Sequence, residues 1–218
     1  MTEPLDEVYA RRFPDDAARA KAAIWKPITA YLQRYVVPDA PVLDIACDRG
    51  YFINNVRAPE RWATDLRDTS DSLQDGIRFL VADGLTLDST LPNAHFGTIF
   101  MSNYLEHLRS PDEVIRQFVV VARLLRPGGR VVVLQPNIRL VGAAYWDFID
   151  HRVALTERSL VEAAELGGIR TVQVITRFLP FTTGRLLPSS ASLVSLYLAF
   201  PPAWWLLGRQ TLYIGERR

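Results

Sequence analysis

From residue 41 onward, the sequence alternates short apolar segments with polar segments that have the composition of helices and turns. Strands that alternate with helices form βαβ units, which build a parallel sheet covered by helices on both faces. The sequence therefore predicts an α/β fold. The apolar runs that have the length of buried strands are residues 41–46, 61–66, 77–82, 96–102 and 130–136, and the helix-like stretches between them are 50–57, 68–75 and 111–125.

Further elements flank this central region. Residues 1–40 are predicted to form an N-terminal helical cap, with a helix from Asp15 to about Tyr35. Residues 41–218 are predicted to form one domain. Its last part holds a helix over 156–166, strands over 171–178 and 211–216, and an apolar insertion over 186–210.

Composition narrows the class of protein. The 25 basic and 24 acidic residues of the 218 leave a formal net charge of +1, which argues against a dedicated nucleic-acid binder. The single cysteine, Cys47, excludes a disulfide framework and a cysteine-ligated zinc site. The first residues lack the apolar stretch of a signal peptide, so we expect a cytoplasmic protein.

The most informative segment is V-L-D-I-A-C-D-R-G, residues 42–50, a buried strand followed by a turn of small and polar residues. Ligands of open α/β sheets bind beyond the carboxyl ends of the strands. A dinucleotide-phosphate loop would need the pattern G-x-G-x-x-G, but Ala46, Asp48 and Tyr51 stand at those positions. A carboxylate in a pyrophosphate cradle would repel the phosphates, so this interpretation is disfavoured.

The segment resembles the first motif of the class I S-adenosylmethionine-dependent methyltransferases, which is approximately V-L-D/E-x-G-x-G-x-G. Within this class the sequence is similar to the type 11 methyltransferases. Val42, Leu43, Asp44 and Gly50 match it, while Ala46 and Asp48 replace two glycines. The resemblance implies a Rossmann-like, seven-stranded, mostly parallel sheet with an antiparallel last strand. It also implies that S-adenosyl-L-methionine is the cofactor. The carboxylate of Asp48 would accept a hydrogen bond from the ammonium group of this cofactor.

Acidic residues follow two more strands at the expected spacing. Asp65 lies 21 residues after Asp44, where a carboxylate can bind ribose hydroxyls. The resemblance implies that Leu66 packs on the face of the adenine and that Asp83 accepts a hydrogen bond from the adenine amino group. It also implies that Gly84 leaves space for the adenine ring to pass close to the backbone. The cofactor-binding residues implied in this way are Asp44, Ala46, Cys47, Asp48, Gly50, Asp65, Leu66, Asp83, Gly84, Ser102 and Asn103.

A second match covers G-T-I-F-M-S-N-Y-L-E-H-L, residues 97–108, which is similar to the family's D-x-V-x-x-x-x-x-L-E-H-L stretch. His107 has two interpretations: a general base near the methyl acceptor, or a residue that caps and braces the following helix together with Glu106. In some relatives similar Glu-His pairs help to hold a metal. Because Asn103 replaces the carboxylate of that pattern, no metal is predicted here.

Residues 135–152 form a long connection rich in aromatic and acidic side chains. One interpretation is an acceptor pocket in which His151, oriented by Asp150 or Asp147, acts as the base. The other is an ordinary helix capped by Asp150, with Trp146 in the core. Both stay open at this point.

The insertion over 186–210 is too short and too interrupted to cross a bilayer. It can lie on the inner face of a membrane, close over a lipid-linked acceptor, form a homodimer, or pack as a plain helix on the sheet.

Several segments also look like a bacterial subgroup associated with glycan and polysaccharide assembly. We therefore expect methyl transfer to an oxygen or nitrogen of a small-molecule, sugar or lipid-linked acceptor. The alternatives are a non-catalytic binding module of the same fold and, less favoured, a nucleotide-dependent oxidoreductase.

Overall fold

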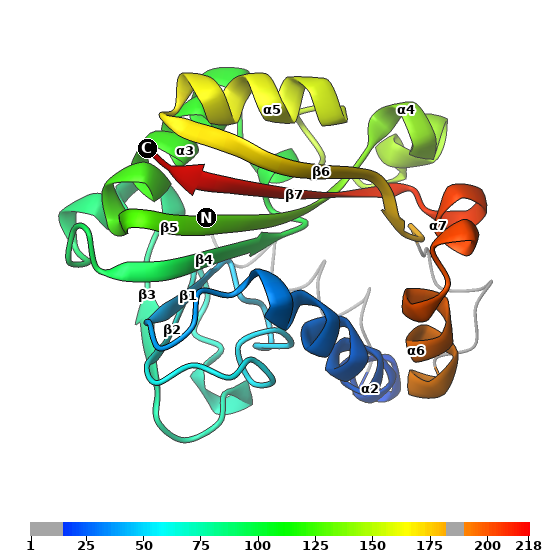
Figure 1. Ribbon diagram of the computed structural model, residues 1–218, viewed down its shortest axis with the longest axis horizontal. Helices are drawn as coiled ribbons and strands as arrows, with labels where there is room; N and C mark the ends of the chain where they lie inside the picture. The colour runs from blue at the N-terminus through cyan, green and yellow to red at the C-terminus, as the bar shows by residue number, and fades with distance from the viewer. Residues whose placement is uncertain (1–14, 182–189) are drawn as a thin grey trace.

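The computed structural model describes residues 15–181 and 190–218, and these contain a seven-stranded sheet (Figure 1). The strand order is β3-β2-β1-β4-β5-β7-β6. The first five strands pair in parallel, whereas β7 is antiparallel to both β5 and β6. The predicted fold class is thereby confirmed. The strands are β1 Val42–Ile45, β2 Arg61–Asp65, β3 Ile77–Val81, β4 Phe96–Ser102, β5 Leu125–Pro136, β6 Ile169–Leu179 and β7 Gln210–Arg217.

Helices cover both faces of the sheet (Figure 1). One face packs against α3 and α5 around Ile99 and Phe118, and the other packs against α2, α6 and α7 around Phe100. Adjacent residues of β4 thus serve opposite cores, as the alternation of side chains along a strand requires. The α-helices are α2 Asp15–Leu32, α3 Pro111–Leu124, α4 Ile138–Val141, α5 Glu157–Leu166, α6 Ala191–Ala199 and α7 Pro201–Leu207. The 3₁₀ helices are η1 Gln33–Tyr35, η2 Ser70–Ser72, η3 Gly84–Ser89, η4 Leu105–His107 and η5 Gly142–Asp147.

The order of the strands reverses between β1 and β4. The chain runs outward from β1 through β2 to β3, and then returns to pair β4 with the opposite side of β1. Such a switch point opens a crevice at the carboxyl ends of the strands, where ligands of α/β proteins bind. The residues that follow β1, β2, β3 and β4 therefore share one edge of the sheet.

The helix α3 lies where the sequence predicts a helix over residues 111–125. Ser110 accepts a hydrogen bond from the backbone N–H of Glu113 at 3.3 Å, and Pro111 occupies the first turn. The predicted end of the helix at residue 125 is confirmed to within one residue. The helix ends at Leu124 and β5 begins at the next residue, with residues 127–129 in a bulge where the β4–β5 register shifts.

The prediction of a helix over residues 50–57 is wrong, because the chain makes successive turns there. The backbone N–H groups of Asn54 and Val56 still donate to carbonyls four residues earlier, and two asparagine side chains donate to further backbone carbonyls. Asn54 Nδ2 donates to the carbonyl of Ser72 at 2.9 Å, and Asn55 Nδ2 donates to the carbonyl of Tyr51 at 2.9 Å. Side-chain hydrogen bonds of this kind compete with helix formation.

The apolar insertion forms two helices instead of one, with its residues 186–189 outside the described part of the chain. The α6 helix lies beside α2 (Figure 1), and α7 packs on β6. Trp204 is buried, with its ring 5.1 Å from Phe178 and 5.6 Å from Tyr31. Leu196 and Trp205 remain exposed, so the segment covers the sheet and still presents an apolar outer surface.

No helix in the described ranges combines the length and the apolar character needed to cross a membrane.

Candidate active site

The loop after β1 has the backbone conformation of a glycine-rich turn although it contains one glycine. Ala46, Asp48 and Gly50 have φ angles of 57°, 50° and 69°. This left-handed region favours glycine because a Cβ atom crowds the neighbouring backbone. These are the three positions at which the methyltransferase motif has glycine, so the motif's conformation is kept while two of its glycines are replaced.

Gly50 cannot be replaced in the same way. A Cβ atom at this position would collide with Leu73 Cδ2 and lie 3.0 Å from Asn54 Nδ2. The loop therefore packs against the segment that follows β2, and a side chain at Gly50 would have to displace the side chain of Leu73.

Asp65, at the end of β2, holds the loop in place. Its Oδ2 accepts a hydrogen bond from the backbone N–H of Asp48 at 3.0 Å, and its Oδ1 accepts one from the backbone N–H of Arg67 at 3.0 Å. The Arg67 Nε atom lies 3.3 Å from the same Oδ1. The predicted ribose-binding carboxylate is thus buried and fixed in orientation.

Asp48 lies between two cations that the sequence did not single out. Arg67 Nη2 is 3.1 Å from its Oδ1, and Lys21 Nζ of α2 is 3.4 Å from its Oδ2. Arg67 follows the predicted ribose carboxylate by two residues, which is a weak local signal. No sequence pattern could have indicated Lys21, because it reaches the loop across 27 residues of chain.

Asp44 and Cys47 are buried under the loop. Burial raises the pKa of Asp44 well above its usual value, and the nearby Asp65 and Asp48 carboxylates raise it further, while a backbone hydrogen bond at Ile53 opposes this. Burial also raises the pKa of the Cys47 thiol, so the thiol stays protonated.

At the end of β3, Asp83 is exposed, and its Oδ1 accepts a hydrogen bond from the backbone N–H of Leu85 at 3.0 Å. Leu66 is 56% exposed at the neighbouring strand end. Gly84 has no room for a Cβ atom, because the hydroxyl of Tyr104 occupies that space. This hydroxyl donates a hydrogen bond to Gln117 Oε1 at 2.9 Å.

The residues after β4 turn sharply away from the strand. Asn103 has a φ of 49°, and its Nδ2 donates to Ser102 Oγ at 2.9 Å. Tyr104, the next residue, is close enough to Asp83 and Asp65 for their charges to raise the pKa of its phenol, although burial is the larger cause. The residues predicted at the ends of β1, β2, β3 and β4 therefore lie along one edge of the sheet, where ligands of α/β proteins bind.

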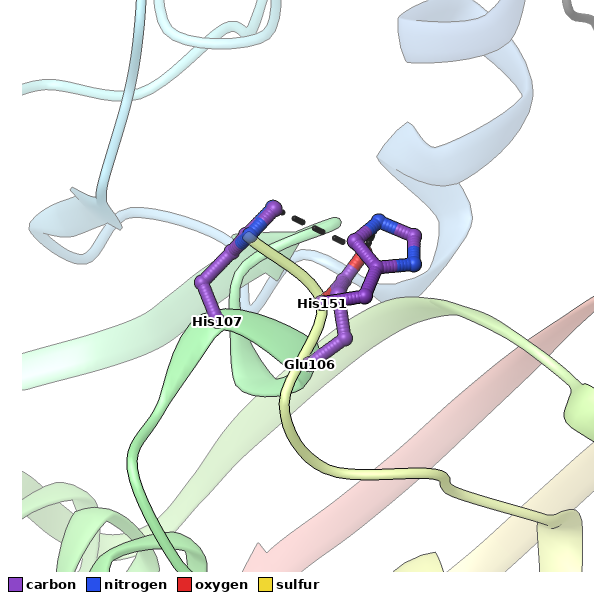
Figure 2. Close-up of side chains that lie close together, drawn as sticks. All are labelled: Glu106, His107 and His151. Atoms are coloured by element: carbon purple, nitrogen blue, oxygen red, sulfur yellow. Dashed lines mark ion pairs between the residues drawn. The ribbon is translucent and has the colours of Figure 1, made fainter. Parts of the chain in front are cut away.

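A second cluster adjoins this crevice and contains both histidines that the sequence singles out. Glu106 and His107 lie on η4, and His151 lies in the connection after η5. The backbone N–H groups of Arg152 and Val153 donate to the carbonyl of Glu106 at 2.8 and 3.1 Å, which docks the connection onto η4. Figure 2 shows the three side chains converging, with Glu106 Oε1 4.0 Å from Nε2 of each imidazole.

The tautomers of both imidazoles follow from their outer contacts. His151 Nδ1 is 2.7 Å from the carbonyl oxygen of Tyr145, and His107 Nδ1 is 3.2 Å from the carbonyl oxygen of Asp150. A carbonyl oxygen only accepts hydrogen bonds, so in the neutral form of each imidazole Nδ1 carries the hydrogen and Nε2 presents a lone pair toward Glu106. Burial lowers the pKa of His151, which favours its neutral form.

Four expectations about these connections are corrected. Asp150 does not orient His151, because its carboxylate lies 3.3 Å from His107 Nδ1 and the carbonyl of Tyr145 holds His151. Asp150 caps no helix, and Trp146 is 52% exposed while its neighbour Tyr145 fills the core. Ser110 caps α3, so Glu106 and His107 do not. Glu106, which is 1% exposed, was missed as a site residue.

The sheet order, the antiparallel β7 and the crevice at the switch point define the class I methyltransferase fold. Residues 9–174 match a family model described as a methyltransferase domain. The chain belongs to this family: it is an enzyme, a methyltransferase that uses S-adenosylmethionine. The two alternatives, a non-catalytic module and a nucleotide-dependent oxidoreductase, are thereby set aside.

Solved structures share the fold at low sequence identity. An S-adenosylmethionine-dependent methyltransferase from Mesorhizobium loti is 19% identical, with a TM-score of 0.64 over 89% of this chain and 98% of that chain. One from Archaeoglobus fulgidus is 15% identical, with a TM-score of 0.63 over 88% and 94%. Geranyl diphosphate C-methyltransferase from Streptomyces coelicolor A3(2) is 14% identical, with a TM-score of 0.61 over 88% and 77%. No curated protein matches the sequence.

Proposed function

We propose that this enzyme transfers the methyl group to an oxygen or nitrogen of a small-molecule, sugar or lipid-linked acceptor, which binds beside Glu106, His107 and His151. The observation that carries the proposal is the position of this cluster. It follows β4 directly and lies at the same sheet edge as the loop of residues 46–50 and Asp65. A cofactor over β1, β2 and β3 would then point its sulfonium group toward the cluster.

The proposed cofactor contacts run along the strand ends. Asp65 binds the ribose hydroxyls, Leu66 covers one face of the adenine and Asp83 accepts from the adenine amino group. Asp48 accepts a hydrogen bond from the ammonium group at the methionine end of the cofactor. Support for the last contact comes from Lys21 in the N-terminal cap of residues 1–40, whose ammonium nitrogen lies 3.4 Å from Asp48 Oδ2.

The chemistry requires little covalent work from the protein. The acceptor atom attacks the methyl carbon in line with the departing sulfur, the C–S bond breaks, and its electron pair stays on sulfur. Alignment of donor and acceptor can supply about 7–11 kcal/mol of the barrier reduction. The acceptor proton leaves at the histidine cluster, where His151 and His107 each present an Nε2 lone pair, a contribution of about 10²–10⁴-fold.

A sugar or lipid-linked sugar is the proposed acceptor class. The similarity of several sequence segments to a subgroup associated with glycan and polysaccharide assembly favours it. The exposed apolar residues of α6 and α7, which include Leu196 and Trp205, and Phe200 between the two helices offer a surface for a lipid tail. Of the structural neighbours, the Streptomyces enzyme was solved with geranyl diphosphate, an isoprenoid diphosphate.

The same surface supports a peripheral contact with the cytoplasmic face of a membrane. We expect the wild-type protein to float with anionic vesicles and the Trp205→Ser variant to lose most of this binding. Trp146→Ser is the matched control, because Trp146 is also exposed but lies outside α6 and α7. Concentration-dependent dimerisation that Trp205→Ser abolishes, without vesicle binding, would replace the membrane with a second copy of the chain.

The experiment that tests the function is calorimetric titration with S-adenosylhomocysteine and with NAD, on wild type and Asp65→Ala. We expect wild type to bind S-adenosylhomocysteine alone and Asp65→Ala to bind it weakly. Transfer of a labelled methyl group to sugars, lipid-linked sugars and phenols then identifies the acceptor class. Methylation of carbon acceptors alone would overturn the assignment to oxygen or nitrogen.

A further inference from the structure

We propose that Glu106, His107 and His151 form a binding site for one divalent transition-metal ion of the zinc class, which holds the acceptor oxygen. The role of the ion rests on the proposed function, whereas the binding of the ion does not. The inference starts from the convergence of a buried carboxylate and two imidazoles from separate parts of the chain (Figure 2).

The distances suit an ion better than they suit direct contacts. Glu106 Oε1 lies 4.0 Å from Nε2 of His107 and 4.0 Å from Nε2 of His151, and the three ligand atoms all lie within 4.8 Å of one another. These gaps exceed a hydrogen bond. Ligands of a tetrahedral zinc ion, with bonds of about 2.0 Å, are about 3.3 Å apart, so closing around an ion needs shifts of less than about 1 Å.

The outer contacts hold each ligand in the correct state. Both Nδ1 atoms face carbonyl oxygens, so both Nε2 lone pairs point to the shared centre. The other carboxylate oxygen of Glu106 accepts a hydrogen bond from Gln135 Nε2 at 3.0 Å, which directs Oε1 to the imidazoles. Metal-binding histidines are fixed in this manner by hydrogen bonds from the second ring nitrogen.

The donor set selects the kind of ion. Two imidazoles and one carboxylate are the ligands of catalytic zinc and of related first-row ions, while magnesium and calcium favour oxygen ligands. The side chains of Glu106 and His151 are 1% and 6% exposed, whereas that of His107 is 24% exposed. The ion is therefore enclosed by the protein on one side and open near His107, where an acceptor oxygen can bind.

Such an ion refines the proton transfer in the proposed reaction. An acceptor hydroxyl bound to the ion loses its proton to water, because the positive charge lowers its pKa. The resulting oxygen anion attacks the methyl carbon, the C–S bond breaks, and S-adenosylhomocysteine is released. With the ion bound, His107 and His151 are ligands and do not accept the proton, so the ion replaces the general-base role given to them in the proposed function.

The test is titration of the protein with Co²⁺, followed by visible absorption, and with Zn²⁺, followed by calorimetry. We expect one ion per chain, with affinity reduced at least about tenfold in Glu106→Gln, His107→Asn and His151→Asn. His95→Asn is the matched control, because it replaces the third histidine, which lies beside Glu60 outside the cluster. His107→Asn is the variant with the least effect on folding, since its side chain is the most exposed of the three.

Titration of the same samples with S-adenosylhomocysteine separates the two proposals. Wild type that binds S-adenosylhomocysteine but neither metal ion, or binds the ions as tightly when the ligands are replaced, overturns the metal site and leaves the methyl transfer intact. Wild type that binds the ions but not S-adenosylhomocysteine overturns the proposed reaction and leaves the metal site intact.

Discussion

The two ends of the crevice are built by different means. At the cofactor end, the loop of residues 46–50 has a backbone in the left-handed region at three positions and is held by Asp65, which lies 17 residues from Asp48. At the acceptor end, the backbone is mostly ordinary, and the site depends on contacts such as that between His107 and Asp150, 43 residues apart. The geometry of the cofactor end is set by local backbone conformation. The geometry of the acceptor end is set by the docking of a segment that is distant in the sequence.

This difference predicts that damage at one end leaves the other intact. The largest effect is expected from Gly50→Ala, because the new Cβ would be strained at a φ of 69° and would collide with Leu73. We expect a loss of about 2–4 kcal/mol in the free energy of unfolding, measured by urea denaturation. Gly76→Ala is the control: its φ is 80° and no atom lies within 4 Å of the added Cβ, so strain alone should cost about 1 kcal/mol. Equal losses in the two variants would show that the packing of Gly50 is unimportant.

Asp65→Ala should come next. It removes the acceptor for the Asp48 and Arg67 backbone N–H groups as well as the proposed ribose contact. Loss of hydrogen bonds to a charged group predicts an affinity for S-adenosylhomocysteine about 10–100-fold lower by calorimetry. Asp68→Ala changes a neighbouring acid that bonds only locally to Ser70, and it should bind as wild type does. Similar losses in both would contradict the special role of Asp65.

Glu106→Gln probes the acceptor end and should affect stability moderately. The amide keeps the size of the buried side chain and loses its charge, so we expect a change of about 1–3 kcal/mol in the free energy of unfolding. The affinity for S-adenosylhomocysteine should stay within about twofold of wild type, because Glu106 is proposed to serve the acceptor and makes none of the proposed cofactor contacts. A large fall in that affinity would mean that the two ends are one cooperative unit.

The smallest effect is expected from Ala46→Gly. Glycine removes the left-handed strain at a φ of 57° but adds freedom to the unfolded chain, so the protein should gain at most about 1 kcal/mol in thermal unfolding. Ala143→Gly, in the connection after α4, is the comparison, because the φ of Ala143 itself is not left-handed and the variant should lose stability. A loss at both positions would show that residue 46 carries no strain.

The cofactor end was largely predictable from the sequence, and the reason is physical. The motif of residues 42–50 and the acids at Asp65 and Asp83 lie at fixed spacings, because a βαβ unit places each strand end at the same edge. At this end of the molecule, the short motifs at the strand ends are therefore enough to predict where their side chains lie. The error over residues 50–57 arose because Asn54 and Asn55 satisfy backbone groups in turns, a competition that polar composition does not reveal.

The acceptor end was only partly predictable. Both histidines could be chosen from the sequence, but their shared partner Glu106 could not, since a buried glutamate looks like a surface residue until the connection of residues 148–153 is docked on it. The partner of His151 was wrong for the same reason. Its orientation is set by the carbonyl of Tyr145, a backbone group that every residue possesses.

The position of β7 has a consequence for how the molecule assembles. β6 stands at the edge of the sheet and joins it through β7, while α6 and α7 lie between these two strands in the sequence. β6 can therefore enter the sheet only when β7 does, after a long loop has closed, which makes the region from β6 to β7 a late and cooperative folding unit. Its amide protons should exchange together, and the apolar surface of α6 and α7 should become ordered in the same step.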